Sequence, residues 1–142
     1  MTRIKRELLF RDLCARLPYG VKVYGLYSPE GSFYSKWHNG ELIAIDRTNT
    51  KNPSFEVKFE NPVPYRDYCG IEEIKPYLRP MSSMTEEEEK EYKHLTSCSD
   101  YTIFTTSDKV VAWLDRKMFD HRGLIPNGLA LEAPEGMYKL KE

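Results

Sequence analysis

The segment Ser54–Phe59 constrains the fold of this chain most strongly, because its apolar and polar residues alternate without a break. A period of two places Phe55, Val57 and Phe59 on the core face of a half-buried strand. Other short stretches before it have the character of strands: Val21–Tyr24, Ser32–Trp37 and Leu42–Ile45. We therefore predict a meander of short antiparallel strands in this part of the chain.

Two turn signals and a fifth strand complete the predicted sheet. The dipeptide Asn39-Gly40 is the preferred centre of a type I′ hairpin turn, in which both residues have positive φ. Ser28–Gly31 is a second turn signal, and Ile71–Leu78 is a candidate fifth strand. A sheet of this kind tends to curl so that its edges are buried. We predict an α+β fold with an SH3-like barrel, and a flat meander packed on helices is the alternative.

Helices are predicted on both sides of this β region. Residues 2–17 carry an apolar stripe of Ile4, Leu8, Leu9 and Leu13 opposite basic residues, and Pro18 ends the helix. Thr85 and Glu88 form a capping box at the start of a second helix that ends near Leu95. The acidic run Glu86–Glu89 then lies in the first helical turn, where the helix dipole favours it.

The last third of the chain is predicted to hold a third helix and a strap. Ser107 caps the helix, which turns Val110, Val111 and Leu114 inward and leaves Trp113 partly exposed. Tyr101–Phe104 reads as a short strand before it, and Asn61–Tyr68 reads as a loop. Gly123–Pro134 is expected to dock on the core as an extended strap. The predicted single domain, 1–142, thus comprises helix 2–17, a β region 21–78 and a helical and strap region 84–134.

Composition excludes several classes of protein. The net charge is −1, so no global basic field attracts nucleic acid, although the first helix is basic. The chain has three cysteines, and no two of them have CxxC spacing, so no metal site is predicted. Neither a signal peptide nor a run of about 20 apolar residues is present, so we expect a cytoplasmic protein without a membrane partner.

Motifs of catalysis are missing from the sequence. His38, His94 and His121 form neither an HxH nor an HExxH pattern. We find no nucleophile elbow, no Walker loop and no dinucleotide fingerprint. The prediction is a protein that is not an enzyme and uses no cofactor.

Two polar clusters are candidate binding sites. His121 and Arg122 precede Gly123 at the predicted end of the third helix, where they either bind an anion or complement the helix dipole. The second cluster surrounds four prolines and forms either a peptide groove or a cover for the mouth of the barrel. Its members are Tyr65, Tyr68, Tyr77 and Arg79.

Several stretches together resemble a group of small uncharacterised proteins encoded by phages, prophages and mobile elements of gut bacteria. They are Asp12–Val21, Ile74–Glu88, Trp113-Leu114, Phe119–Ile125 and Gly128–Ala133. The resemblance covers the first helix and the back half of the chain, and it carries over no catalytic residue. It implies an accessory protein that acts in a bacterial host cell by binding a host component.

Three functions are consistent with these observations. The first is a non-catalytic interaction module that binds a host or phage protein, in some cases against a host defence system. The second is a protein that sequesters a small molecule or nucleotide in a pocket lined by aromatic and arginine side chains. The third is weak nucleic-acid binding through the basic first helix and aromatic residues of the sheet.

Overall fold

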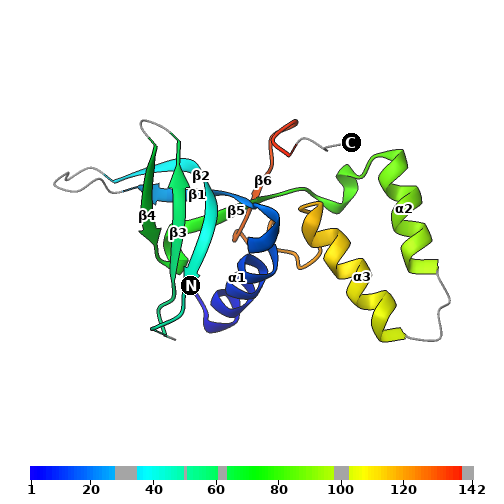
Figure 1. Cartoon of the computed structure of the whole chain (residues 1–142), viewed down its shortest axis with the longest axis horizontal. Helices are drawn as coiled ribbons and strands as arrows, with labels where there is room; N and C mark the ends of the chain where they lie inside the picture. Colours follow the sequence, from blue (N-terminus) through cyan, green and yellow to red (C-terminus); the bar gives the residue numbers. More distant parts are fainter. Residues whose placement is uncertain (28–34, 50, 61–63, 98–102, 139–142) are drawn as a thin grey trace.

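The computed structural model describes residues 1–27, 35–49, 51–60, 64–97 and 103–138. It has an α+β fold in which an N-terminal helix packs on a six-stranded, mostly antiparallel sheet (Figure 1). The first half of the chain holds α1 (Arg3–Arg16), η1 (Leu17–Tyr19), β1 (Lys22–Tyr27), β2 (Lys36–Asp46) and β3 (Ser54–Phe59). The second half holds β4 (Tyr65–Cys69), η2 (Ile71–Glu73), β5 (Ile74–Leu78), η3 (Met81–Ser83), α2 (Glu86–Ser97), α3 (Ile103–Arg116) and β6 (Leu131–Glu132).

The strands lie in the order β4-β3-β2-β1-β5-β6. The first four form an antiparallel meander, β5 returns to pair with β1, and β6 adds a parallel edge. The sheet is open, so the predicted SH3-like barrel does not close. It curls enough for the thiol of Cys69, at the end of β4, to lie 3.5 Å from the backbone oxygen of Leu26 in β1.

One face of the sheet and α1 enclose the main core. The alternation in β3 is confirmed, because Phe55, Val57 and Phe59 are completely buried. Leu9 and Leu13 of α1 pack against these strands and are also completely buried. The predicted helix is confirmed in position, and the side chain of its N-cap, Thr2, accepts a bond of 3.2 Å from the Lys5 amide.

The predicted stripe of α1 is wrong at one position. Ile4 is 78% exposed, because it lies five residues before Leu9, about 140° around the helix, and so faces away from the buried side. The hydrophobic pattern identified the helix correctly but not which side of its first turn is covered.

The predicted hairpin at Asn39-Gly40 is wrong. Both residues lie inside the continuous strand β2, where Gly40 pairs with Val23 on one side and Phe59 on the other. A β-carbon on Gly40 would lie 2.6 Å from Cγ1 of Val57, so glycine allows β3 to approach closely here. The turn signal Ser28–Gly31 and most of the predicted strand Ser32–Trp37 lie outside the described residues.

Two further predictions about local structure are corrected. The predicted loop Asn61–Tyr68 contains the start of β4, whose residues pair with β3 from Phe59↔Tyr65 onward. The strand expected at Tyr101–Phe104 is not formed by its described part, because α3 begins at Ile103. Ser107 therefore lies inside α3 and does not cap it.

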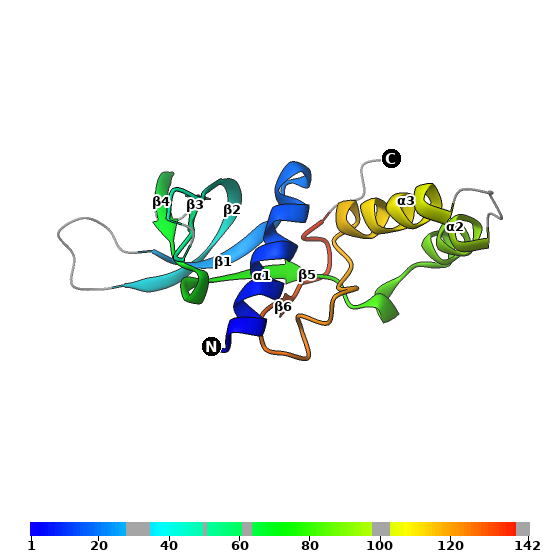
Figure 2. The same ribbon diagram turned by 90° about the horizontal axis from the view of Figure 1, so that it is seen from below.

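The hairpin of α2 and α3 projects from one end of the sheet (Figures 1 and 2). The capping box is confirmed: the amide of Glu88 donates to Oγ1 of Thr85 at 3.2 Å, and the amide of Thr85 donates to Oε1 of Glu88 at 3.1 Å. Trp113 is 3% exposed and stacks between Tyr92 and Phe119, in contrast to the partial exposure that we predicted. Val111, predicted to face inward, is 41% exposed.

The C-terminal strap docks on the core as predicted, but residues 124–130 form turns and bends rather than the extended chain that was expected. Leu124, Leu129 and Ala130 are buried, and β6 pairs with β5. The carboxylate of Asp120 accepts hydrogen bonds from the amides of Leu124 and Ile125, at 2.8 and 2.9 Å, which fixes the turn that starts the strap.

Candidate functional site

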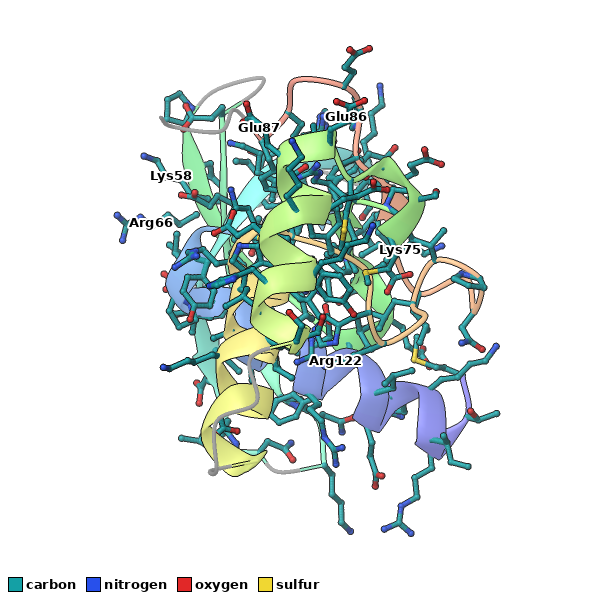
Figure 3. The ribbon with its side chains drawn as sticks, turned by 90° about the vertical axis from the view of Figure 1, so that its right-hand side faces the viewer. Lys58, Arg66, Lys75, Glu86, Glu87 and Arg122 are labelled. Carbon is teal, nitrogen blue, oxygen red and sulfur yellow. The ribbon has the colours of Figure 1, made fainter. Side chains whose placement is uncertain are left out.

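His121 and Arg122, predicted either to bind an anion or to complement a helix dipole, face carboxylates of the protein itself. Nη1 of Arg122 donates to Asp12 at 2.7 Å and to Asp115 at 2.8 Å, and Nη2 donates to the second oxygen of Asp115 at 3.1 Å. Nε2 of His121 lies 2.8 Å from the same carboxylate. Figure 3 shows Arg122 against α1. These contacts use both terminal nitrogens of the Arg122 guanidinium, so Arg122 joins α1 to α3.

Arg16 completes this buried cluster. Its Nε donates to Asp12 at 2.9 Å, and its Nη2 donates to the carbonyl oxygen of Phe119 at 2.7 Å. Burial by itself raises the pKa of Asp115, but hydrogen bonds from His121 and Arg122 outweigh it and hold that pKa at about 2. Two carboxylates and two guanidinium groups therefore balance each other where the helical hairpin meets the sheet.

The predicted helix end at Gly123 is also corrected. α3 ends at Arg116, and Met118, with φ of 64°, is the residue in the left-handed conformation. The amides of Met118 and Phe119 donate to the carbonyls of Asp115 and Leu114, as in a Schellman cap. His121 and Arg122 thus lie beyond the helix and act through direct bonds.

Arg79 is likewise used inside the protein. Its two terminal nitrogens donate to the two oxygens of Glu88, at 2.9 and 2.6 Å, and its guanidinium carbon lies 4.2 Å from the centre of the Phe119 ring. Burial raises the pKa of Glu88, but the hydrogen bonds from Arg79 and Thr85 lower it by more than burial raises it, so the net shift is downward. Arg79 therefore holds the first turn of α2 to the end of β5.

The predicted tyrosine cluster is divided by the sheet. Tyr65 and Tyr68 lie in β4, whereas Tyr77 lies in β5, and three strands lie between β4 and β5 in the sheet order. Tyr77 is 8% exposed, and its hydroxyl donates to Oδ1 of Asn39 at 2.6 Å. Tyr65 and Tyr68 remain accessible, with exposed fractions of 38% and 60%.

A cleft of about 580 Å³ lies between the N-terminal half of α1 and the loop that joins β2 to β3. The basic face of the first helix is predicted above only as a surface for weak nucleic-acid binding, and none of the residues that line this cleft is a predicted site residue. The helix contributes residues three or four apart, which share one face. The lining residues are Met1, Arg3, Arg6, Glu7, Phe10, Arg47, Lys51, Pro53 and Ile71.

Local hydrogen bonds position the loop side of this cleft. Oδ1 of Asp46 accepts from the amide and the hydroxyl of Thr48, at 2.9 and 2.7 Å. Oδ1 of Asn49 accepts from the amides of Lys51 and Asn52, both at 3.2 Å. Such side-chain turns hold a loop without a sheet partner, and here they direct Arg47 and Lys51 toward α1.

The cleft is strongly basic. Four cationic side chains and one carboxylate line it, and the carboxylate, Glu7, is paired with Nε of Arg3 at 3.1 Å. Arg6 crosses the cleft and donates to Oδ1 of Asn52 at 3.0 Å. Like charges gathered around a concave surface focus the field there and attract an anion. The sequence held one signal of this site, the spacing of Arg3, Arg6 and Phe10, but could not show that the loop lies opposite.

A second groove, of about 570 Å³, lies between Arg79–Thr85 and the strap at Glu132–Tyr138. Among the described residues that line it, Arg79 is the basic one, and its guanidinium is already paired with Glu88. The hydroxyl of Tyr138 donates to the carbonyl oxygen of Tyr77 at 2.7 Å, which fixes the strap. The described lining of this groove therefore carries less positive charge than that of the cleft at α1.

The two described thiols are poor nucleophiles. Cys69 is buried, and burial raises its pKa to about 12. Burial also raises the pKa of Cys14, although Arg47 opposes the shift. Since the thiolate is the reactive form, neither cysteine is activated at neutral pH. Cys98 lies outside the described residues.

Comparisons with known proteins found no relative of this chain. No known family model, curated protein or solved structure matches the chain. Within the residues described above, no three His, Cys, Asp or Glu side chains gather as metal ligands would. In the same part of the chain, every helix is too short or too polar to cross a membrane.

Proposed function

We propose that this protein is a non-catalytic binding protein that holds a small phosphorylated molecule in the cleft between α1 and the β2–β3 loop. The observation that carries the proposal is the convergence of Arg3, Arg6, Arg47 and Lys51 on one concave surface. Its volume of about 580 Å³ is within the range of small-molecule sites.

The chemistry of these side chains supports a phosphate rather than an uncharged ligand. Arginine presents a planar fork of N–H donors that matches phosphate oxygens, and lysine adds a compact positive charge. Without an anion, these cations repel one another across the cleft, and among its described lining residues Glu7 is the one carboxylate that offsets them. A ligand that carries several negative charges removes this repulsion.

The resemblance to phage and mobile-element proteins gives the proposal a biological setting. An accessory protein that binds but does not convert its ligand acts by sequestration. We propose that it keeps a phosphorylated signal of the bacterial host away from its receptor, in the host cytoplasm. Such a role requires tight binding and no catalytic group.

Isothermal titration with inorganic triphosphate tests the proposed function. We expect one saturable site on the wild type and about tenfold weaker binding for Lys51→Gln, since a charged hydrogen bond contributes roughly 1.5–3 kcal/mol. Arg11→Gln is the matched control, because Arg11 is exposed on α1 and does not line the cleft. No binding to the wild type, or equal weakening by the control, would contradict the proposal.

A second candidate function, protein interaction, is favoured by the edge strand β4. Tyr68 is 60% exposed there, and Arg66 lies opposite Lys58 on the neighbouring strand, a pairing of like charges. Both cations point away from the sheet (Figure 3). An extended acidic segment of a partner protein would pair with this edge.

Affinity capture from bacterial lysate distinguishes this second function. The double variant Arg66→Ala, Tyr68→Ala should lose a stoichiometric partner that the wild type and Lys51→Gln both retain. A partner that is retained by the double variant would exclude the β4 edge as its binding site.

A further inference from the structure

The two ends of the basic cleft differ in chemistry. At one end the guanidinium carbon of Arg47 lies 5.3 Å from the centre of the Phe10 ring. Phe10 is half-buried and is held from behind by Phe55, whose ring is 6.1 Å away at an angle of 63°. Arg47 is exposed and lines the cleft, so the pair presents a flat, positively charged surface.

The other end carries cationic groups without an aromatic side chain among its lining residues. Arg3 and Arg6 lie earlier on the same face of α1, and Lys51 lies in the loop. An α-helix rises about 1.5 Å per residue, so Arg3 is about 10 Å from Phe10 along the helix axis. A ligand that uses both ends must therefore have a planar part and an anionic part some distance apart.

We propose that the ligand is a nucleotide, whose base stacks on Arg47 beside Phe10 and whose phosphates lie among Arg3, Arg6 and Lys51. This inference rests on the proposed function and adds the class of ligand. Bases stack well on aromatic rings and on arginine planes, because every base has a π face. Phosphates are bound by arginine and lysine side chains.

Simpler anions use only part of the cleft. Inorganic phosphate leaves the apolar wall of Phe10, Pro53 and Ile71 without a contact. An apolar acid with a single charge covers that wall but leaves most of the cationic excess unbalanced. A nucleotide satisfies both parts of the lining.

The first experiment compares ligands by isothermal titration of the full chain. The probes are the 5′-triphosphates of adenosine, guanosine, cytidine and uridine, with inorganic triphosphate as the reference, at one salt concentration. We expect at least one nucleoside triphosphate to bind about tenfold more tightly than inorganic triphosphate, the gain of one stacked base.

Arg47→Lys separates stacking from charge, because lysine keeps the positive charge but lacks the planar group. We expect this variant to bind inorganic triphosphate as the wild type does and to lose most of the extra affinity for the nucleoside triphosphate. Lys51→Gln should weaken both ligands by the same factor. Arg11→Gln should bind both as the wild type does.

Other outcomes would overturn the inference. Equal affinity for inorganic and nucleoside triphosphates would show that the base does not contribute to binding. So would a tighter binding of the nucleoside triphosphate that Arg47→Lys leaves unchanged. Either result would contradict the nucleotide inference but not the proposed function. Failure of every triphosphate to bind would remove the proposed function as well. A short single-stranded oligonucleotide that binds far more tightly than any mononucleotide would identify the cleft as part of a nucleic-acid surface.

Discussion

The guanidinium of Arg16 donates a hydrogen bond of 2.7 Å to the backbone carbonyl of Phe119, 103 residues later in the chain. Arg16 lies in the helix that covers the sheet, and Phe119 follows the helix that ends the projecting hairpin. Both residues are completely buried. The bond therefore joins the two parts of the fold at the point where the hairpin leaves the sheet.

Replacement of Arg16 should strongly destabilise the protein. Arg16→Met removes this bond and leaves the buried carboxylate of Asp12 with Arg122 alone, which should lower the free energy of unfolding by about 3 kcal/mol. Urea denaturation followed by circular dichroism measures the change. Arg11→Met, on the exposed side of the same helix, should change it by less than about 0.5 kcal/mol. Equal stability of the two variants would mean that the buried cluster does not support the fold.

Acid should destabilise the protein in a specific pH range. The pKa of Asp115 is about 2 in the folded state, against an ordinary value of 3.8. A lowered pKa contributes stability above the ordinary value, and that contribution is lost as the pH falls through the lowered one. We expect a loss of about 2 kcal/mol from this group between about pH 4 and pH 2.

Asp115→Asn tests the assignment of this acid sensitivity. The variant should be less stable than the wild type at pH 7, because Arg16 and Arg122 lose a charged partner. Its free energy of unfolding should nevertheless fall less steeply between pH 4 and pH 2. A slope equal to that of the wild type would show that other carboxylates cause the acid sensitivity.

The Arg79–Glu88 pair should depend on the shape of the arginine as well as on its charge. Arg79→Lys keeps the charge but loses the two parallel hydrogen bonds and the stacking over Phe119, so we expect a loss of about 1–2 kcal/mol. Thermal denaturation provides the measurement. Lys75→Arg, in the strand β5 that precedes Arg79, is the control and should leave the melting temperature unchanged. A melting temperature of Arg79→Lys equal to that of the wild type would show that charge alone holds α2.

Gly40→Ala distinguishes a strand from a turn at Asn39-Gly40. In the strand, the added β-carbon would lie 2.6 Å from Val57 and 2.8 Å from the carbonyl oxygen of Lys58, so we expect a loss of about 2 kcal/mol or more. Gly128→Ala is the reference, since Gly128 has φ of 71° and open space around it. That variant should lose only about 1 kcal/mol, the cost of the left-handed conformation. Equal losses would favour a turn at Gly40.

Features with a local cause could be predicted from the sequence. The alternation of β3, the placement of α1 and the capping box of Thr85 and Glu88 all depend on residues a few positions apart. Their physical cause is the period of two in a strand, the period of 3.6 in a helix and a side chain that satisfies an amide three residues away. These features were predicted correctly because neighbouring residues alone decide them.

The candidate site was predicted poorly for the opposite reason. Tyr65 and Tyr77 were grouped by composition, but the sheet order separates them by three strands. Arg122 was predicted to bind an anion or to complement a helix dipole, but folding brings the carboxylate of Asp12 within 2.7 Å of it. The sequence contains the charges and not the distances between them.

The sequence by itself determined the α+β class, the N-terminal helix, the alternation of β3 and the basic character of α1. Only the tertiary structure decided that Gly40 lies within a strand. Glycine is needed there because Val57, in a different strand, approaches it closely. It also decided that Arg47 and Lys51 lie opposite α1 and form a cleft with it. Whether a charged side chain belongs to a binding site depends on the residues near it in space, and the packing of segments that are distant in the chain decides which residues those are.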